Sequence, residues 1–198
     1  MLLWYTCFSD EYYSVKLLFK GSCFIIMRLF IAVNFNDDTR NKLITIKDEL
    51  RANSIRGSFT LPENLHLTLA FIGECNAAQV DDLKSILDKI NFESFDLTIE
   101  RIGCFKRNDG DLWWAGIKES PNLTLLHRDI LDKLKHAGFP VENRKYSPHI
   151  TLGRKVVINK MPSPIVPFNE TIAKIELMES KRFNGKLTYI SIHEREGH

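Results

Sequence analysis

The sequence has little cysteine, and its cysteines are far apart. The four residues are Cys7, Cys23, Cys75 and Cys104, and no two of them form a CxxC pair. A chain of 198 residues with so few cysteines is not typical of a disulfide-stapled secreted domain. Structural zinc also needs closely spaced ligand pairs. We therefore predict free thiols, no cysteine metal site and a reducing, cytoplasmic location.

An excess of charge of one sign is also missing. The chain has 27 basic and 25 acidic residues, a formal net charge of +2. Proteins that coat long nucleic acids carry a stronger basic footprint, whereas a protein that binds one terminal phosphate does not need one. The hydrophobic share of 44% and the charged share of 26% are ordinary for a globular domain. This composition argues against a disordered chain, a collagen-like chain and a membrane bundle.

The first 26 residues differ from the rest. They hold 7 of the 21 aromatic residues, lack a basic start and contain no apolar run long enough for a signal core or a membrane span. A regular strand pattern then begins at Met27. We predict that residues 1–26 are an upstream extension and that 27–198 form a single domain, a length near the usual domain size. The alternative is a genuine N-terminal strand or arm.

The periodicity of the apolar residues predicts a mixture of strands and helices. Period-2 alternation predicts strands at 28–35, 65–72, 95–102, 112–118, 149–157, 172–179 and 186–194. A 3.6-residue period predicts helices at 38–52, capped by Asp37 or Asp38, at 77–90, and from Pro121 to Gly138. Residues 159–168 contain three prolines and are expected to form a loop, and Asn184-Gly185 is a hairpin turn signal. We predict an α+β fold.

One short motif occurs twice. His66-Leu-Thr-Leu69 and His149-Ile-Thr-Leu152 each begin an apolar strand, and about half of the domain separates them. This spacing predicts two related lobes around a central cleft. Alternate residues of a strand share a face, so each histidine lies beside its threonine while the apolar residues face the core. Two lobes related by a pseudo-twofold axis would bring both pairs to the cleft.

Two histidines and two threonines fit phosphodiester chemistry. Histidine titrates near neutral pH, so one ring can act as base while the other acts as acid. Threonine hydroxyls can donate hydrogen bonds to the phosphate oxygens. A zinc site would need a third protein ligand, and none stands at a recognisable spacing. His127 and His136 are expected to be solvated on their helix, and we predict no metal and no cofactor.

The paired motifs resemble those of the two-histidine phosphoesterases, and specifically the RNA 2′,3′-cyclic phosphodiesterases, also called 2′-5′ RNA ligases. The resemblance runs from Met27 nearly to the C-terminus. It is carried by five stretches of the chain, at residues 28–33, 62–74, 102–105, 112–117 and 147–154. The family implies a bilobal α+β fold and metal-free hydrolysis of a 2′,3′-cyclic phosphate to a 2′-phosphate, with reversible 2′-5′ ligation. It implies a substrate that is an RNA end or a nucleoside 2′,3′-cyclic phosphate.

The resemblance also implies residue roles. His66 would be the proton donor to the departing 3′ oxygen and His149 the proton acceptor from water, with Thr68 and Thr151 holding phosphate oxygens. Arg154 would contact phosphate, although strict alternation places it opposite His149, so a bulge at Gly153 is required.

Other candidate contacts come from the residues themselves. Tyr146 is a candidate for stacking on a base or for packing in the core. Lys106, Arg107 and Arg144 could contact RNA phosphates or simply be solvated, and at least one of Trp113 and Trp114 is expected in the core.

Three alternatives stay open. The chain could act on a small cyclic nucleotide or a 2′-5′ oligonucleotide, it could bind RNA ends without catalysis, or it could be a structural domain. We expect a monomer without a membrane segment. A basic path leading away from the cleft would favour RNA over a small nucleotide.

Overall fold

The computed structural model describes residues 15–19, 22–141 and 145–198. Its strands, in chain order, are β1 Val15–Phe19, β2 Ser22–Asn34, β3 Ser54–Phe59, β4 His66–Cys75, β5 Phe95–Phe105, β6 Asp111–Ile117, β7 His149–Ile158, β8 Phe168–Ile172, β9 Lys174–Phe183 and β10 Lys186–Glu196. Its helices are α1 Asp37–Ala52, α2 Ala77–Asp88 and α3 Pro121–His136, with a 3₁₀ turn at Pro62–Asn64. The α+β prediction is confirmed.

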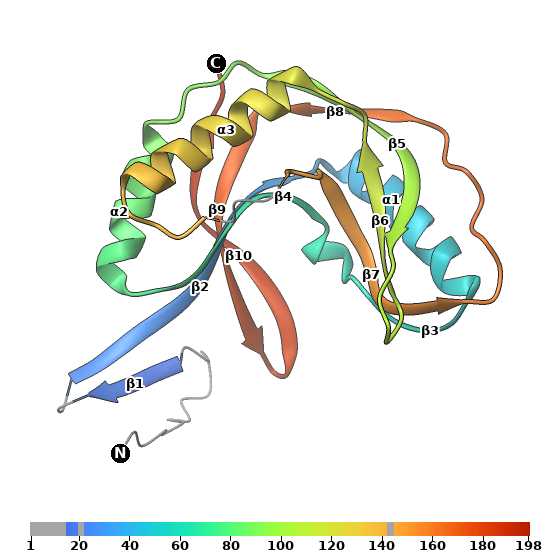
Figure 1. Cartoon of the computed structure of the whole chain (residues 1–198), viewed down its shortest axis with the longest axis horizontal. Helices are drawn as coiled ribbons and strands as arrows, with labels where there is room; N and C mark the ends of the chain where they lie inside the picture. The colour runs from blue at the N-terminus through green and yellow to red at the C-terminus, as the bar shows by residue number, and fades with distance from the viewer. Residues whose placement is uncertain (1–14, 20–21, 142–144) are drawn as a thin grey trace.

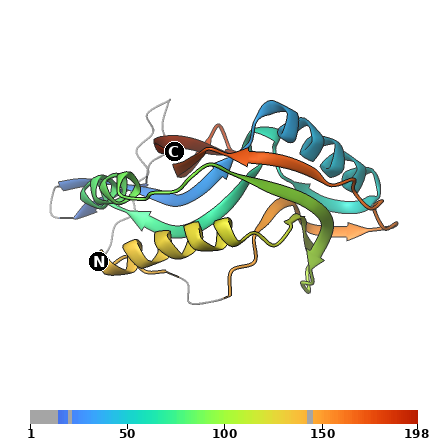
Figure 2. The ribbon, with the colours of Figure 1, turned by 90° about the horizontal axis from the view of Figure 1, so that it is seen from above.

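The strands form one curved antiparallel sheet. Its order is β10-β9-β2-β4-β7-β6-β5-β8, with β1 paired to β2 and β3 paired to β7. The ribbon arches over its length, with α2 and α3 at one end and α1 at the other (Figure 1). Seen from above, α1 and α3 lie on opposite sides of the strands (Figure 2).

The two lobes meet between the two motif strands. One lobe contains β10, β9, β2 and β4, and the other contains β7, β6, β5 and β8 together with β3. Each lobe therefore takes strands from both halves of the sequence, since β9 pairs with β2 and β3 pairs with β7. The motif strands β4 and β7 are joined through a single residue pair, Leu67 with Ile150. We call this pair the central seam.

The predicted helices are confirmed, with a difference at the first cap. Asn36, not Asp37 or Asp38, caps α1, and its side chain accepts a hydrogen bond from the Thr39 backbone N–H at 2.8 Å. Helix α3 buries Leu126, Ile130 and Leu134, as its period predicts. The hairpin turn at Asn184-Gly185 is also confirmed, because both residues have positive φ values.

Two edge strands differ from the sequence predictions. Strand β3 exposes most of its side chains, so it carries no apolar alternation. The predicted loop at 159–168 and strand at 172–179 were wrong at their boundary: β8 occupies Phe168–Ile172, and β9 begins after Ala173.

The core confirms the tryptophan prediction, because Trp113 is 2% exposed. Cys75 and Cys104 are free thiols. Among the described residues, no helix is long and apolar enough to cross a membrane. Strand β2 passes through Met27 without a break, and the domain boundary at that residue stays a prediction.

Candidate active site

The central seam places the two His-x-Thr motifs side by side. The paired residues Leu67 and Ile150 are the middle residues of the two motifs, and both are fully buried in the core. Since side chains alternate along a strand, the histidines and threonines project from the opposite face. Continuing the antiparallel register sets His66 toward Thr151 and Thr68 toward His149. All four side chains line one cavity of about 810 Å³.

His66 is held from both ring nitrogens. Its Nδ1 lies 2.8 Å from the Asn64 carbonyl oxygen, and its Nε2 lies 2.9 Å from Thr68 Oγ1. A carbonyl only accepts, so Nδ1 carries a proton and the neutral ring has its lone pair on Nε2. The ring also contacts Phe30 and Tyr189, with centroid separations of 5.0 and 5.1 Å.

His149 repeats this arrangement in the second lobe. Its Nδ1 lies 2.7 Å from the Ser147 carbonyl oxygen, so the proton again belongs to Nδ1. The Phe105 ring packs edge-on against the imidazole at 5.2 Å between centroids. In both motifs, therefore, a carbonyl two residues earlier fixes the tautomer and Nε2 is the nitrogen that can exchange a proton in the cavity.

The environment of His66 favours its neutral form. Burial lowers the pKa of His66 below its usual value near 6.5, and the charges of Arg154 and His149 lower it further. The hydrogen bond to the Asn64 carbonyl acts in the opposite direction. In the free protein, His66 is therefore neutral at pH 7.

Basic side chains surround the cavity. Arg28, Arg107, Lys145 and Arg154 line it, and none of the described residues lining it is acidic. Arg154 reaches this face because the β6–β7 register shifts: Trp114 pairs with Thr151 and Trp113 with Gly153, which leaves Leu152 as an extra residue. A bulge was required at Gly153 to bring Arg154 to the face of His149, and the structure has this bulge one residue earlier, at Leu152.

The structure corrects the expectation for His127. This residue is not simply solvated, because it lines the cavity and its ring stacks on Tyr146 at 3.7 Å with an interplanar angle of 7°. The Tyr146 hydroxyl donates to the Thr68 carbonyl oxygen at 3.0 Å. Tyr146 thus packs against the first motif while belonging to the segment that leads to the second. His136 is exposed, as predicted.

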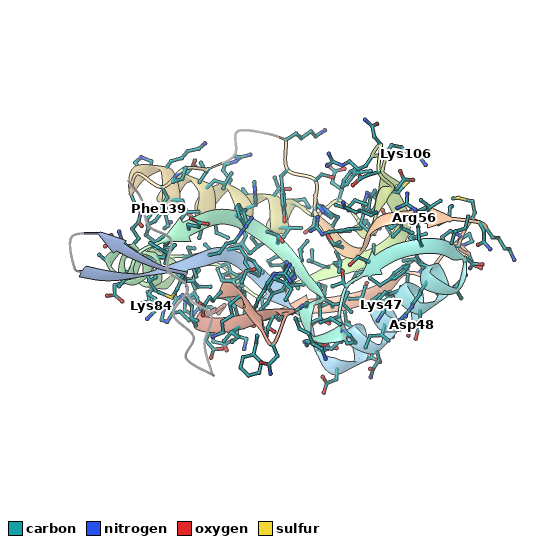
Figure 3. All side chains as sticks on the ribbon, turned by 90° about the horizontal axis from the view of Figure 1, so that it is seen from below. Lys47, Asp48, Arg56, Lys84, Lys106 and Phe139 are labelled. Atoms are coloured by element: carbon teal, nitrogen blue, oxygen red, sulfur yellow. The ribbon has the colours of Figure 1, made fainter. Side chains whose placement is uncertain are left out.

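The two basic residues of the β5–β6 loop, Lys106 and Arg107, lie in different places. Arg107 lines the cavity, whereas Lys106 projects from the edge of the molecule and pairs with Asp111 at 2.8 Å (Figure 3). Arg144 lies outside the described residues.

Sequence reasoning missed several cavity residues: Arg28, Phe30, Phe105, His127 and Tyr189. Strand pairing brings β2 beside β4 and the β9–β10 hairpin beside β2, and no local pattern encodes that pairing. The resemblance to known stretches around Arg28 and Phe105 was the only available signal. Among the described residues, no cluster of three or more His, Cys, Asp or Glu side chains could hold a metal ion.

Replacing Arg154 with glutamine is expected to raise the pKa of His66. The Arg154 charge opposes protonation of the ring, so removing it moves the pKa up toward 6.5. An NMR titration of the His66 ring protons measures this. Arg101→Gln, which removes a cation that lies over the Trp114 ring outside the cavity, is the matched control. An unchanged or lower pKa of His66 in Arg154→Gln would contradict the conclusion that the Arg154 charge lowers this pKa.

Replacing Tyr146 with phenylalanine is expected to lower the free energy of unfolding by about 1 kcal/mol, the usual net value of one hydrogen bond. The change removes the bond to the Thr68 carbonyl and keeps the ring that stacks on His127. Urea denaturation measures the difference. Tyr189→Phe is the comparison, since this change keeps the ring that packs against Phe30 and His66 and leaves the backbone N–H in place. Equal effects of the two changes would refute the prediction.

A curved antiparallel sheet that presents two His-x-Thr motifs on one cavity defines a two-histidine phosphoesterase. The sequence profile described as LigT like Phosphoesterase matches residues 33–114 and 116–189. The chain belongs to this LigT-like phosphoesterase family.

Curated relatives are similar to this chain in sequence over most of their length. The chain is 36% identical over 131 residues to the RNA 2′,3′-cyclic phosphodiesterase of Archaeoglobus fulgidus, covering 65% of this chain and 72% of that one. It is 28% identical over 167 residues to the protein of the same name from Escherichia coli, covering 82% and 92%. The crystal structure of E. coli LigT complexed with 3′-AMP superposes with a TM-score of 0.75 at 27% identity, covering 86% of this chain and 98% of that one.

Proposed function

We propose that this protein is an enzyme that hydrolyses the 2′,3′-cyclic phosphate at an RNA end to a 2′-phosphate. The observation that carries the proposal is the convergence of His66, Thr68, His149 and Thr151 on one basic cavity. The relatives named RNA 2′,3′-cyclic phosphodiesterase support this substrate. The complete set of four motif side chains supports an enzyme rather than a module that only binds RNA ends.

Hydrolysis needs a base on one side of phosphorus and an acid on the other. His149 accepts a proton from water through Nε2 while the water oxygen forms its bond to phosphorus. The bond from phosphorus to the 3′ oxygen breaks, and His66 Nε2–H donates its proton to that oxygen. The product is a 2′-phosphate, His66 ends neutral and His149 ends protonated. Exchange with solvent restores both rings.

The contact between His66 and Thr68 changes direction during this cycle. When His66 is neutral, the Thr68 hydroxyl donates to Nε2 across the 2.9 Å contact. When His66 is protonated, Nε2–H donates to Thr68 Oγ1, and the hydroxyl proton becomes free to bind a phosphate oxygen. Protonation of His66 thus also makes the Thr68 hydroxyl available as a hydrogen-bond donor to the substrate.

Because its pKa is lowered, His66, the proposed proton donor, is neutral in the free protein at pH 7. A bound phosphodiester carries a negative charge, and a nearby negative charge raises the pKa of an imidazole. Substrate binding therefore raises the pKa of His66 and favours the protonated ring that the mechanism needs. Thr151 and Arg154 then hold the phosphate oxygens, and the charge that develops on them in the transition state is neutralised by these donors.

The basic rim favours an RNA end over a small nucleotide. Arg107 comes from the β5–β6 loop and Lys145 from the segment before β7, and both line the cavity, so it contains cations besides Arg28 and Arg154. Added phosphates would meet these cations, and affinity should fall with salt concentration. Tyr146 and His127, whose rings stack on each other, line the same cavity. We propose that the protein acts as a monomer, which sedimentation can check.

The test is hydrolysis of a nucleoside 2′,3′-cyclic phosphate and of an RNA bearing the same end, in EDTA, with 2′- and 3′-phosphate products separated. We expect the 2′-phosphate from both substrates and a lower KM for the RNA. Turnover of the nucleotide alone would favour the small-nucleotide alternative. No turnover of either substrate would overturn the proposal, and loss of activity in EDTA would overturn the metal-free mechanism.

A further inference from the structure

Asn64 is a buried polar residue that no step above uses. It ends the 3₁₀ turn Pro62–Asn64, two residues before His66, and is 4% exposed. Burying a side-chain amide is costly unless its hydrogen bonds are satisfied. Its partners therefore indicate why an amide stands at this position.

The Asn64 amide binds the backbone of the β9–β10 hairpin. Its Nδ2 donates to the Leu187 carbonyl oxygen at 2.8 Å, and its Oδ1 accepts from the Tyr189 N–H at 3.2 Å. These two residues are alternate positions of β10, the last strand at this edge of the sheet. The amide thus pairs with the edge as another strand would.

The same hairpin forms a wall of the active-site cavity. Both Leu187 and Tyr189 line the cavity, and the Tyr189 ring packs edge-on against His66. The position of the hairpin backbone therefore sets the surroundings of the His66 ring.

The backbone of Asn64 contacts His66 itself. The Asn64 carbonyl oxygen lies 2.8 Å from His66 Nδ1 and fixes the ring tautomer. In the second lobe the Ser147 carbonyl does the same for His149, but Ser147 is exposed. The residue whose carbonyl fixes the tautomer is thus buried and held by its side chain in the first motif, whereas the corresponding residue of the second motif is exposed.

We propose that Asn64 is a positioning residue that couples the β9–β10 hairpin to His66. Its side chain holds the hairpin, and the same anchoring holds its carbonyl against Nδ1. Loss of the side chain releases both, so the His66 ring samples the wrong tautomer and the cavity wall moves. The catalytic consequence rests on the proposed function, whereas the effect on the ring does not.

The test compares Asn64→Ala and Asn64→Asp with Asn169→Ala. Asn169 is the matched control because its side chain accepts a hydrogen bond from Thr98 between β5 and β8, away from the cavity. Nitrogen NMR of the imidazole rings reports the tautomers. We expect Asn64→Ala to show a mixed His66 tautomer, an unchanged His149 tautomer and a fall in kcat of about tenfold. Asn64→Asp keeps the acceptor for the Tyr189 N–H but sets a carboxylate oxygen against the Leu187 carbonyl oxygen, so its loss should be at least as large as that of Asn64→Ala.

The unsubstituted protein supplies a second measurement that does not depend on how the variants fold. Its Tyr189 amide should exchange slowly with solvent, and His66 should carry its proton on Nδ1. Rapid exchange of that amide would overturn the proposal. So would a folded Asn64→Ala protein in which the His66 tautomer and kcat match those of Asn169→Ala. If the wild type proves inactive on cyclic phosphates, the NMR results still decide the proposal.

Discussion

Replacing either His66 or His149 with alanine is expected to lower kcat by about 10²- to 10⁴-fold, the usual contribution of a positioned acid or base. Each change removes the ring nitrogen that the proposed mechanism uses for proton transfer on that side of the phosphorus atom. The assay is hydrolysis of a nucleoside 2′,3′-cyclic phosphate at saturating concentration. His136→Ala is the matched control, since that imidazole is exposed at the end of α3.

A second substrate separates the two roles. In a cyclic phosphate whose leaving oxygen is phenolic, the leaving group departs without a proton, so the acid matters less. We expect His66→Ala to recover most of its lost activity on this substrate and His149→Ala to recover little. The reverse pattern would exchange the two roles, and full activity of either alanine variant would remove that residue from the mechanism.

Replacing Thr68 or Thr151 with valine is expected to lower kcat by about 10²-fold each, because each change removes a donor to charge that develops on the phosphate oxygens. Valine keeps the branched shape of the side chain. Thr171→Val is the control, since Thr171 is an exposed strand residue on β8 whose hydroxyl donates to Asp96. An effect no larger than that of Thr171→Val would contradict the role.

The two threonines should also differ. The Thr68 hydroxyl lies 2.9 Å from His66 Nε2, so Thr68→Val should change the titration of His66 more than Thr151→Val does. NMR titration of His66 in both variants makes the comparison.

The sequence predicted the motif strands well because their signal is local. Alternation in β4 and β7 separates the core residues from His66, Thr68, His149 and Thr151, and the register of the seam agrees with that separation. Counting residues along a regular strand places Arg154 on the face opposite His149, and only the family resemblance, with the bulge that it required, predicted Arg154 at the cavity. Strands β3 and β8 were not predicted at their observed bounds, since β3 is largely exposed and one of the two buried residues of β8 is the polar Glu170, which leaves little apolar pattern in either strand.

The remaining site residues depend on pairing between distant segments. Tyr189 reaches His66 only because β9 pairs with β2 and carries β10 with it. The period of α3 predicts a solvated His127, because Leu126, Ile130 and Leu134 form the buried stripe of the helix. The helix also faces β4 beside this stripe, where His127 meets Tyr146. No periodicity in α3 distinguishes such a flank from the solvent side.

The central seam has a consequence for substrate exchange. The motif strands share one paired position, whereas β6 and β7 pair along most of their length. Separating the strands at the seam thus breaks far fewer backbone contacts than opening any other part of the sheet near the site. The Asn64 carbonyl orients His66 and the Ser147 carbonyl orients His149. We therefore expect separation of β4 from β7 to change the distance between the two imidazoles without rotating either ring. We expect the cleft to widen for product release and to close again with both proton-transfer groups already aligned.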